Sequence, residues 1–277
     1  MQDHVDADSD AAMTDDVEFI ECWRCSLPVA IHADECHHCH ARPKRVREGL
    51  HATSLRRDEY WPLKALLYSY VALLATGIAH AAALDARFGD VDSPTAEMLR
   101  EAKVQVAVVE AIDTAIVIIA FAVLRSHGSR PTQPEMRSLW IWPASFPLLA
   151  GMLAINVAYH GLLRHFIGIT FFEERLMEEP SLLALLTTCV QPAIVEEAYC
   201  RGLAVRVLRE FLGLHGVVWI TALMFGLMHV SVMLSIPYLI LFGVFVGYVR
   251  MKSGAVWLPM LLHFLHNLAI TLYEWNF

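Results

Sequence analysis

Hydrophobic residues in this chain are gathered into long blocks that begin near Pro62 and continue almost to the C-terminus. Each block is long enough for a helix that crosses the hydrocarbon core of a bilayer, which takes about 20 apolar residues. Short polar segments separate the blocks. The pattern predicts seven membrane-spanning helices, at residues 62–84, 104–124, 139–163, 181–200, 214–231, 233–250 and 255–274.

The later spans contain prolines, which can kink or break a membrane helix. We therefore expect bends or breaks in the second half of the chain, at or near Pro143, Pro147, Pro192, Pro237 and Pro259.

Basic residues lie at alternate ends of the predicted spans. The linker at residues 41–61 carries six Lys or Arg, and Arg201, Arg206 and Arg209 follow the fourth span. Loops 85–103 and 164–180 hold more acids than bases. Because cytoplasmic loops carry the excess of Lys and Arg, we expect a multi-pass protein of the cytoplasmic (inner) membrane with a cytoplasmic N-terminus.

Composition agrees with a membrane protein. Hydrophobic residues make up 56% of the chain, against about 45–50% in soluble domains. The predicted fold class is all-α, a multi-spanning helical membrane domain at residues 62–277. The net charge of −8 comes largely from residues 1–21, which hold eight acids and neither Lys nor Arg. Such a segment is typical of an acidic, disordered tail.

Four cysteines precede the linker in two CxxC pairs separated by ten residues, at Cys22, Cys25, Cys36 and Cys39. Thiolates two residues apart in a tight turn face one ion, and two such pairs complete the tetrahedron of a structural Zn²⁺ site. A redox-active CxxC is the weaker alternative, because two pairs occur. We expect residues 22–40 to form a zinc ribbon that needs its metal to fold and contacts a cytoplasmic partner.

Three polar clusters interrupt the apolar blocks, where an ionised side chain is costly unless it is paired or performs chemistry. In the first cluster, Glu197 and Arg201 are four residues apart, a spacing that suits a salt bridge on a helix. Glu196 points about 100° away from Glu197, so it can serve a different spot. The alternative for this cluster is an ordinary helix end, where charges meet water.

Histidines carry the other two clusters. His229 ends an apolar helix, one turn after Phe225, and a lone histidine there is often structural. His263 and Asn267 share one face of the last span, and an imidazole with a carboxamide supplies two directed donors, as an oxyanion hole requires. Interhelical hydrogen bonding is the alternative for this pair.

In this order and in a membrane, the clusters resemble the motifs of the CPBP family, which includes CAAX prenyl proteases and bacteriocin-processing intramembrane endopeptidases. The EExxxR motif stands at 196–201, FxxxH at 225–229 and HxxxN at 263–267. The resemblance covers about residues 140–275 and leaves out the ribbon and the first two spans. All three motifs are complete, so we expect an active enzyme.

The resemblance implies hydrolysis of a peptide bond inside the bilayer. On this hypothesis Glu196 and His229 activate a water molecule, while His263 and Asn267 stabilise the oxyanion. The supporting residues are Glu197, Arg201 and Phe225. A Glu/His/His set could instead hold a divalent ion, but we favour the metal-free glutamate mechanism. The expected substrate is a membrane protein or a lipidated peptide in contact with the bilayer, and no nucleic-acid partner is expected.

Straight spans would keep the proposed catalytic pair apart. At ~1.5 Å per residue, Glu196 lies ~24 Å from the outer start of the fourth span and His229 lies ~22 Å from the inner start of the fifth. Either the fourth span bends near Pro192, or residues 202–213 are themselves partly submerged. We expect the second, because that segment contains the apolar residues Leu203, Val205, Val207, Leu208, Phe211 and Leu212.

Glu110 and Asp113 lie three residues apart in the second span. They either extend the cavity or are satisfied locally by His80, Asn156 or His160. The main alternative function is a non-catalytic membrane scaffold or a bacteriocin self-immunity factor with the same fold. A transporter with a carboxylate proton path is less supported, because no inverted repeat is visible.

Overall fold

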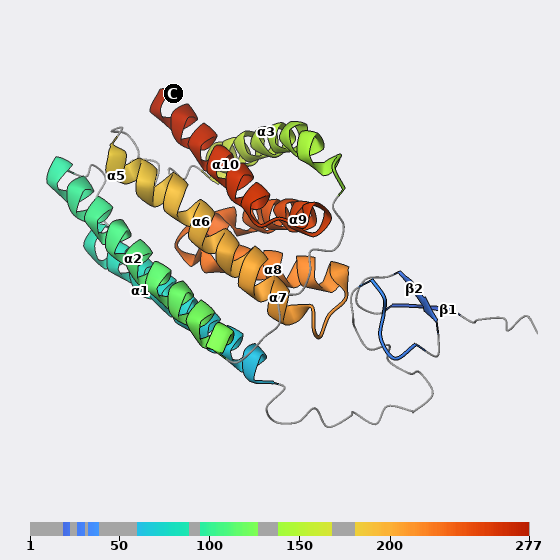
Figure 1. Cartoon of the computed structure of the whole chain (residues 1–277). Helices are drawn as coiled ribbons and strands as arrows, with labels where there is room; N and C mark the ends of the chain where they lie inside the picture. The colour runs from blue at the N-terminus through green and yellow to red at the C-terminus, as the bar shows by residue number, and fades with distance from the viewer. Residues whose placement is uncertain are drawn as a thin grey trace, which may run out of the picture.

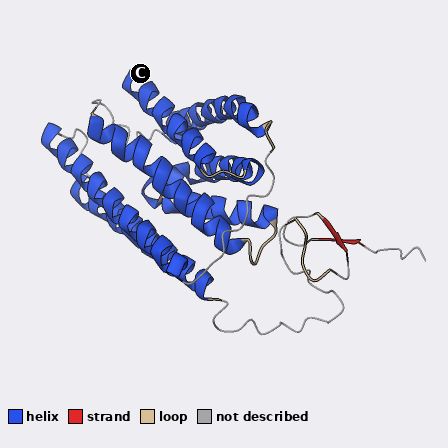
Figure 2. Cartoon of the chain, viewed as in Figure 1, coloured by secondary structure: helices blue, strands red, loops and turns tan. Residues whose placement is uncertain are grey.

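The computed structural model describes residues 19–22, 27–30, 33–38, 60–88, 95–126, 138–167 and 181–276. From residue 60 onward the described segments are helices joined by short turns (Figures 1 and 2). The predicted all-α, multi-spanning fold class is therefore confirmed. The helices are α1 (Trp61–Phe88), α2 (Ala96–Ser126), α3 (Ile141–Ile167), α5 (Leu182–Leu185), α6 (Gln191–Glu197), α7 (Val205–Leu208), α8 (Leu214–Met228), α9 (Ile236–Ser253) and α10 (Trp257–Asn276), with π segments η1 (Leu186–Val190) and η2 (Ala198–Ala204) and the 3-10 segment η3 (Val230–Ser235).

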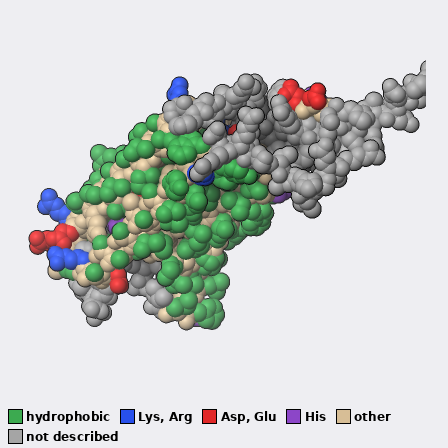
Figure 3. All heavy atoms as spheres, turned by 90° about the horizontal axis from the view of Figure 1, so that it is seen from below, with side chains coloured by type: hydrophobic (Ala, Val, Ile, Leu, Met, Phe, Trp, Pro, Cys, Tyr) green, Lys and Arg blue, Asp and Glu red, His purple; other side chains and the backbone are tan. Residues whose placement is uncertain are grey.

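Four helical segments are long and apolar enough to cross a membrane, at Trp61–Arg87, Ala96–Arg125, Ile141–Ile167 and Val230–Ser253. Their outward faces are hydrophobic: on α2, for example, Ile118 and Ile119 are each 61% exposed. On the face drawn in Figure 3, hydrophobic side chains cover most of the described surface and most of the charged side chains lie near its edges. Contact with lipid accounts for such a surface, since water would not favour it. The chain is an integral membrane protein.

The helices form two layers with one helix between them. Helices α1 and α2 pair along one side, and α3, α9 and α10 lie on the other (Figure 1). Between them runs a continuous helix of five segments, α5, η1, α6, η2 and α7, which we call the central helix (residues 182–208). It contacts α2, α8 and α10, so its side chains can reach both layers.

The central helix differs from the predicted fourth span. The span was expected to end at residue 200, but the helix continues to Leu208. It begins with Ser181, whose Oγ accepts a hydrogen bond from the N–H of Ala184 at 3.1 Å, an ordinary N-cap. Pro192 does not end the helix, because it lies in the first turn of α6, directly after the wide turn of η1. Such π turns often occur where a functional side chain must be placed.

The length of the central helix removes the depth problem. After residue 208 the chain turns and α8 runs back alongside η2 and α7. Glu196 then lies ~18 Å before the turn and His229 ~22 Å after it, so the two reach a similar depth. The apolar residues Leu203, Val205 and Leu208 lie within the central helix and are buried in the protein.

Helix α8 stops at His229, whose backbone (φ −91°, ψ 43°) leaves the helical region. The 3-10 segment η3 follows, and α9 begins at Ile236 with Pro237 in its first turn, where a missing N–H costs nothing. Helix α9 ends at Gly254 with φ 68°, a left-handed conformation that favours glycine, and the N–H of Gly254 bonds to Arg250 O at 3.1 Å. The break at η3 turns the chain so that the end of α8 faces the central helix.

Two short strands pair antiparallel: β1 (Phe19–Glu21), which lies at the end of the segment predicted as a disordered tail, and β2 (Pro28–Ala30), which lies in the predicted ribbon. Cys22 and Cys36, one from each CxxC pair, are both buried. Cys25 and Cys39 lie outside the described residues, as do the acidic tail up to residue 18 and most of the basic linker. The zinc ribbon therefore stays a prediction.

If the ribbon binds zinc, the purified chain will contain about one Zn²⁺ ion per molecule, because four thiolates close one tetrahedral site. We expect Cys36→Ser to remove most of that zinc in a measurement by atomic absorption. Cys189→Ser, which changes a buried cysteine of the membrane domain, should keep it. Zinc retained equally by both variants would contradict the ribbon.

Candidate active site

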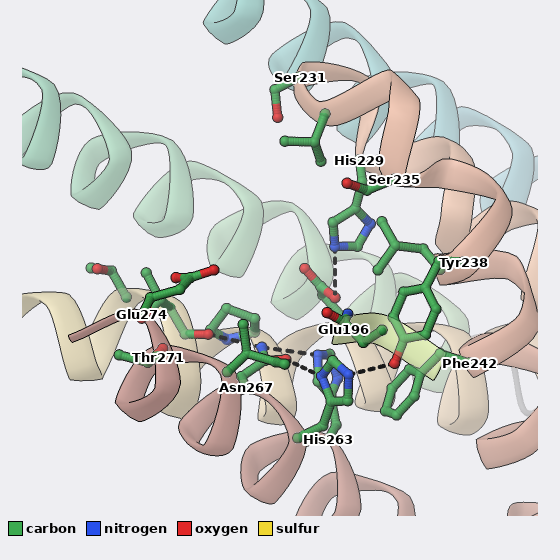
Figure 4. Close-up of a pocket in the computed structure, with 18 of the residues that line it drawn as sticks. Glu196, His229, Ser231, Ser235, Tyr238, Phe242, His263, Asn267, Thr271 and Glu274 are labelled. Carbon is green, nitrogen blue, oxygen red and sulfur yellow. Dashed lines mark hydrogen bonds and ion pairs between the residues drawn. The ribbon is translucent and has the colours of Figure 1, made fainter. Parts of the chain in front are cut away.

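Glu196 and His229 come together where the central helix passes the end of α8. The carboxylate Oε2 of Glu196 lies 3.7 Å from Nε2 of His229. The two side chains are 16% and 24% exposed, so each keeps access to a cavity. Figure 4 shows them facing each other across this pocket. The structure thus brings together the two residues that the sequence proposed as a catalytic pair.

The His229 ring is held in one orientation. Its Nδ1 lies 2.9 Å from the carbonyl oxygen of Phe225, one turn earlier on α8. Because a carbonyl only accepts, Nδ1 carries a proton and donates it. In the neutral ring Nε2 is then the basic nitrogen, and it is the one that faces Glu196. The Phe225 ring also packs against His229 and His263, at centroid separations of 5.0 and 5.5 Å.

Glu197 is held differently from its neighbour. Its side chain is fully buried, and its Oε1 accepts a hydrogen bond from Arg201 Nη1 at 3.0 Å, which is the salt bridge that the spacing predicted. The same oxygen lies 3.2 Å from Nδ1 of His263 on α10. The sequence did not predict this second contact, because nothing along the chain relates α10 to the central helix.

Arg201 occupies a tight, polar site inside the protein. It is fully buried, its Nη2 donates to the carbonyl of Gly243 at 2.9 Å, and its guanidinium lies 4.6 Å from the centre of the Phe225 ring. A Cβ on Gly243 would lie 3.0 Å from Cα of Ala222 and 3.2 Å from Arg201 Nη2. Glycine therefore lets α9 approach closely enough to bond the arginine. Arg250 Nε donates to the carbonyl of Arg201 at 3.0 Å, which ties α9 to the same point.

The amide of Asn267 is oriented by a backbone carbonyl. Its Nδ2 donates to Thr188 O at 2.8 Å and lies 3.2 Å from Nε2 of His263. In a regular helix the carbonyl of Thr188 would receive the N–H of residue 192, but that residue is proline and has none. Asn267 supplies a donor in its place, as neighbouring helices do at membrane prolines.

A further pair of side chains fixes the other face of this amide. Oδ1 of Asn267 lies 3.1 Å from Nδ1 of His266, and Nε2 of His266 lies 2.6 Å from the hydroxyl of Tyr238 on α9. Sequence reasoning missed His266 and Tyr238. His266 lies on α10 and Tyr238 on α9, and no spacing along the chain relates these two helices.

A cavity of about 350 Å³ starts at these residues. Its walls near the cluster come from Glu196, His229, His263 and Asn267, and it continues between α2, α3 and the end of α10. Both polar and apolar side chains line it. It can therefore admit a peptide segment as well as water.

The carboxylates of the second predicted span have separate environments. Glu110 lines the cavity, as one of the two alternatives expected. Asp113 accepts a hydrogen bond from Thr76 on α1 at 2.6 Å, a partner that was not expected. His160 bonds to Asn156 and to Ser235 at 2.9–3.1 Å.

The alternative Glu/His/His set for a divalent ion is Glu196, His229 and His263, whereas the carboxylate of Glu197 is held by Arg201 and His263. Within the ranges that the structure describes, no group of three His, Cys, Asp or Glu could hold an ion.

Residues 178–269 match the sequence profile of a family described as Type II CAAX prenyl endopeptidase Rce1-like. The resemblance to CAAX and CPBP proteases is thereby confirmed, although the matched segment is shorter than the expected core at 140–275. No curated protein and no solved structure matches the chain.

The Rce1-like segment contains the whole polar cluster, from Glu196 to Asn267. It begins just before the central helix and ends within α10, so α1, α2 and α3 lie outside it. The match supports a protease of the CAAX type in the membrane. The roles of individual residues are a separate question.

Arg201→Met should lower the free energy of unfolding by about 3–5 kcal/mol, because the buried Glu197 carboxylate would lose its counter-ion. Chemical denaturation in detergent, followed by circular dichroism, would measure the loss. Arg87→Met is the matched control, since Arg87 and Glu101 form an exposed ion pair with side chains 66% and 48% exposed. Removing it should cost no more than about 1 kcal/mol. Equal losses would contradict the structural importance of the buried pair.

Proposed function

We propose that the chain is an intramembrane endopeptidase that hydrolyses a peptide bond with a glutamate-activated water molecule. The observation that carries the proposal is the position of Glu196, which lines a cavity within the helix bundle and whose Oε2 lies 3.7 Å from His229 Nε2. A carboxylate and an imidazole so placed are general-base partners.

The separation of the pair fits a water-mediated step. The distance of 3.7 Å is longer than a direct hydrogen bond. One water molecule can contact both the carboxylate and the imidazole. In the proposed reaction Glu196 takes a proton from this water as its oxygen attacks the carbonyl carbon. The C–N bond then breaks, and the proton passes to the departing amine. Glu196 thus acts first as a base and then as an acid, and His229 orients the water through Nε2.

His263 and Asn267 are proposed to stabilise the oxyanion. In the neutral ring, Nδ1–H of His263 points to Glu197, so Nε2 accepts from Asn267. When the ring takes a second proton from water in the cavity, Nε2–H can donate to the oxyanion, and the Glu197 carboxylate balances the new charge. The hydrogen bond from Asn267 to Nε2 is then replaced, which releases one amide N–H for the same oxygen. Glu197 and Arg201 act through His263 and do not contact the substrate.

This arrangement favours the enzyme over the non-catalytic alternatives. A scaffold or immunity factor would not need Glu196 and His229 side by side on a cavity wall, where each charge is costly. The proposed substrate is a peptide segment of a membrane-associated or lipidated protein. We also propose that the protein resides in the cytoplasmic membrane, with its N-terminal ribbon in the cytoplasm available to a partner.

Glu196→Gln and His229→Ala should each reduce kcat by about 10²–10⁴-fold, because each removes a group that handles the proton. Asn267→Ala should cost about 10²–10³-fold, as for a lost oxyanion donor. The assay is hydrolysis of a fluorescence-quenched peptide library, with and without a prenyl group, by protein in detergent. Glu101→Gln, an exposed acid on α2, is the control. Full activity in both Glu196→Gln and His229→Ala would refute the assignment.

Chelation separates the glutamate mechanism from a metal mechanism. Hydrolysis should continue after exhaustive treatment with 1,10-phenanthroline, because no step of the proposed reaction uses an ion. The Cys36→Ser variant, treated in parallel, removes the contribution of the predicted ribbon zinc. Loss of activity in both proteins, restored by added Zn²⁺, would establish metal chemistry instead.

A further inference from the structure

A serine and a histidine on the cavity wall form a hydrogen bond that has no part in the proposed peptide hydrolysis. Ser235 is the last residue of η3, and its Oγ lies 2.9 Å from Nε2 of His160 on α3. Both residues line the cavity, as does Asn156, and Figure 4 shows Ser235 on its wall. Polar side chains within a membrane domain are costly and often mark a functional site.

The direction of this hydrogen bond follows from the other side of the imidazole ring. Nδ1 of His160 lies 3.0 Å from the backbone carbonyl oxygen of Asn156 and 3.1 Å from its side-chain Oδ1. Because a carbonyl oxygen only accepts, Nδ1 carries the proton of the neutral ring. Nε2 is then the basic nitrogen, and the hydroxyl of Ser235 donates to it. The serine proton thus already points at a base.

The contact between α3 and the start of α9 does not depend on this serine alone. The hydroxyl of Tyr159, next to His160, donates to the carbonyl oxygen of Leu234 at 2.6 Å and joins the same two segments. Ser235 is the residue before α9, where a serine oxygen often caps the helix, but its side chain makes no capping bond. The hydroxyl therefore bonds to His160 and does not cap the helix.

A hydroxyl, an imidazole and a third group that holds the ring are the arrangement that activates a serine nucleophile. Asn156 is the third group here, through its side-chain and backbone oxygens. An amide fixes the tautomer of His160 but brings no negative charge to stabilise the imidazolium that forms during the reaction. The serine is therefore suited to acyl groups that carry a good leaving group, such as thioesters and activated esters.

We infer that Ser235 is a nucleophile that takes acyl groups from thioesters or activated esters and transfers them to water. Its Oγ bonds to the carbonyl carbon while the hydroxyl proton passes to Nε2 of His160. The bond from that carbon to the leaving sulfur or oxygen then breaks, and the leaving group takes the proton from His160. Water, deprotonated by the same nitrogen, next cleaves the acyl–serine ester, which releases a carboxylic acid and returns the proton to Oγ.

The cavity beside Ser235 offers apolar contacts to the chain of an acyl group. Leu239 lies four residues after Ser235, a spacing that places both on one face of a helix, and Val157 follows Asn156 on α3. Both apolar residues line the cavity. Glu196 has no part in this reaction, so the inference goes beyond the proposed function and does not rest on it.

Reaction with a fluorophosphonate tests the inference without a natural substrate. The full chain in detergent is treated with a fluorophosphonate probe, whose P–F bond breaks as Oγ of Ser235 bonds to phosphorus, and the modified peptide is identified by mass spectrometry. We expect labelling at Ser235. His160→Gln should slow it by about 10²–10⁴-fold, because the base is lost. Ser231→Ala is the matched control and should leave it unchanged, since Ser231 lies in the same segment and lines the same cavity.

The unaltered protein gives a result that does not depend on how any variant folds. No labelling at Ser235, labelling at Ser231 instead, or an equal rate in His160→Gln would overturn the inference.

Hydrolysis of p-nitrophenyl butyrate is the second measurement, because it follows the complete reaction with an activated ester. We expect the unaltered protein to hydrolyse this ester, Ser235→Ala to lose the activity and Glu196→Gln to keep it. Activity that survives in Ser235→Ala, or that is lost in Glu196→Gln, would place ester cleavage at the peptide site and overturn the inference. A protein that is labelled at Ser235 yet cleaves no peptide would instead overturn the proposed peptide hydrolysis alone.

Discussion

The buried charge cluster of Glu197, Arg201 and His263 is the interaction on which the rest of the site depends. A carboxylate and a guanidinium with no exposed surface are stable only when they are paired and hydrogen-bonded. Arg201 meets this need by bonding to Gly243 on α9, and Glu197 by bonding to His263 on α10. One ion pair thereby joins three helices, and rotation of the His263 ring would break its hydrogen bond to the buried carboxylate.

Adjacency on a helix then gives the two glutamates opposite environments. Because successive side chains diverge by about 100°, anchoring Glu197 inside the protein turns Glu196 toward the cavity and His229. Helix α8 returns antiparallel to the central helix and stops at His229, so the imidazole reaches the depth of Glu196. Glu197 is thus the rigid, buried carboxylate, and Glu196 is the one that faces the cavity. The pre-organised side chains need little rearrangement before a water molecule can react.

Part of this arrangement depends on residues close together in the sequence, and the rest depends on how distant segments pack. Helix type, the apolar spans and the i,i+4 pairing of Glu197 with Arg201 depend on neighbours along the chain, so they could be predicted. The end of the central helix could not be predicted. Its basic residues are typical of a cytoplasmic loop, but Arg201 and Arg209 are buried in the protein. Tyr238, His266 and the Thr188 carbonyl depend on how α9, α10 and the central helix meet, and no periodicity encodes that.

Pro192 matters because its backbone nitrogen carries no hydrogen. Any other residue there would bring an N–H that competes with Asn267 for the carbonyl of Thr188. This effect of the backbone N–H does not depend on side-chain size. A replacement that matches only the volume of proline would therefore not preserve the hydrogen bond from Asn267 to Thr188. A scan that tested all residue types at position 192 would separate backbone demand from packing demand, and the same comparison could reveal hidden donors and acceptors in other membrane helices.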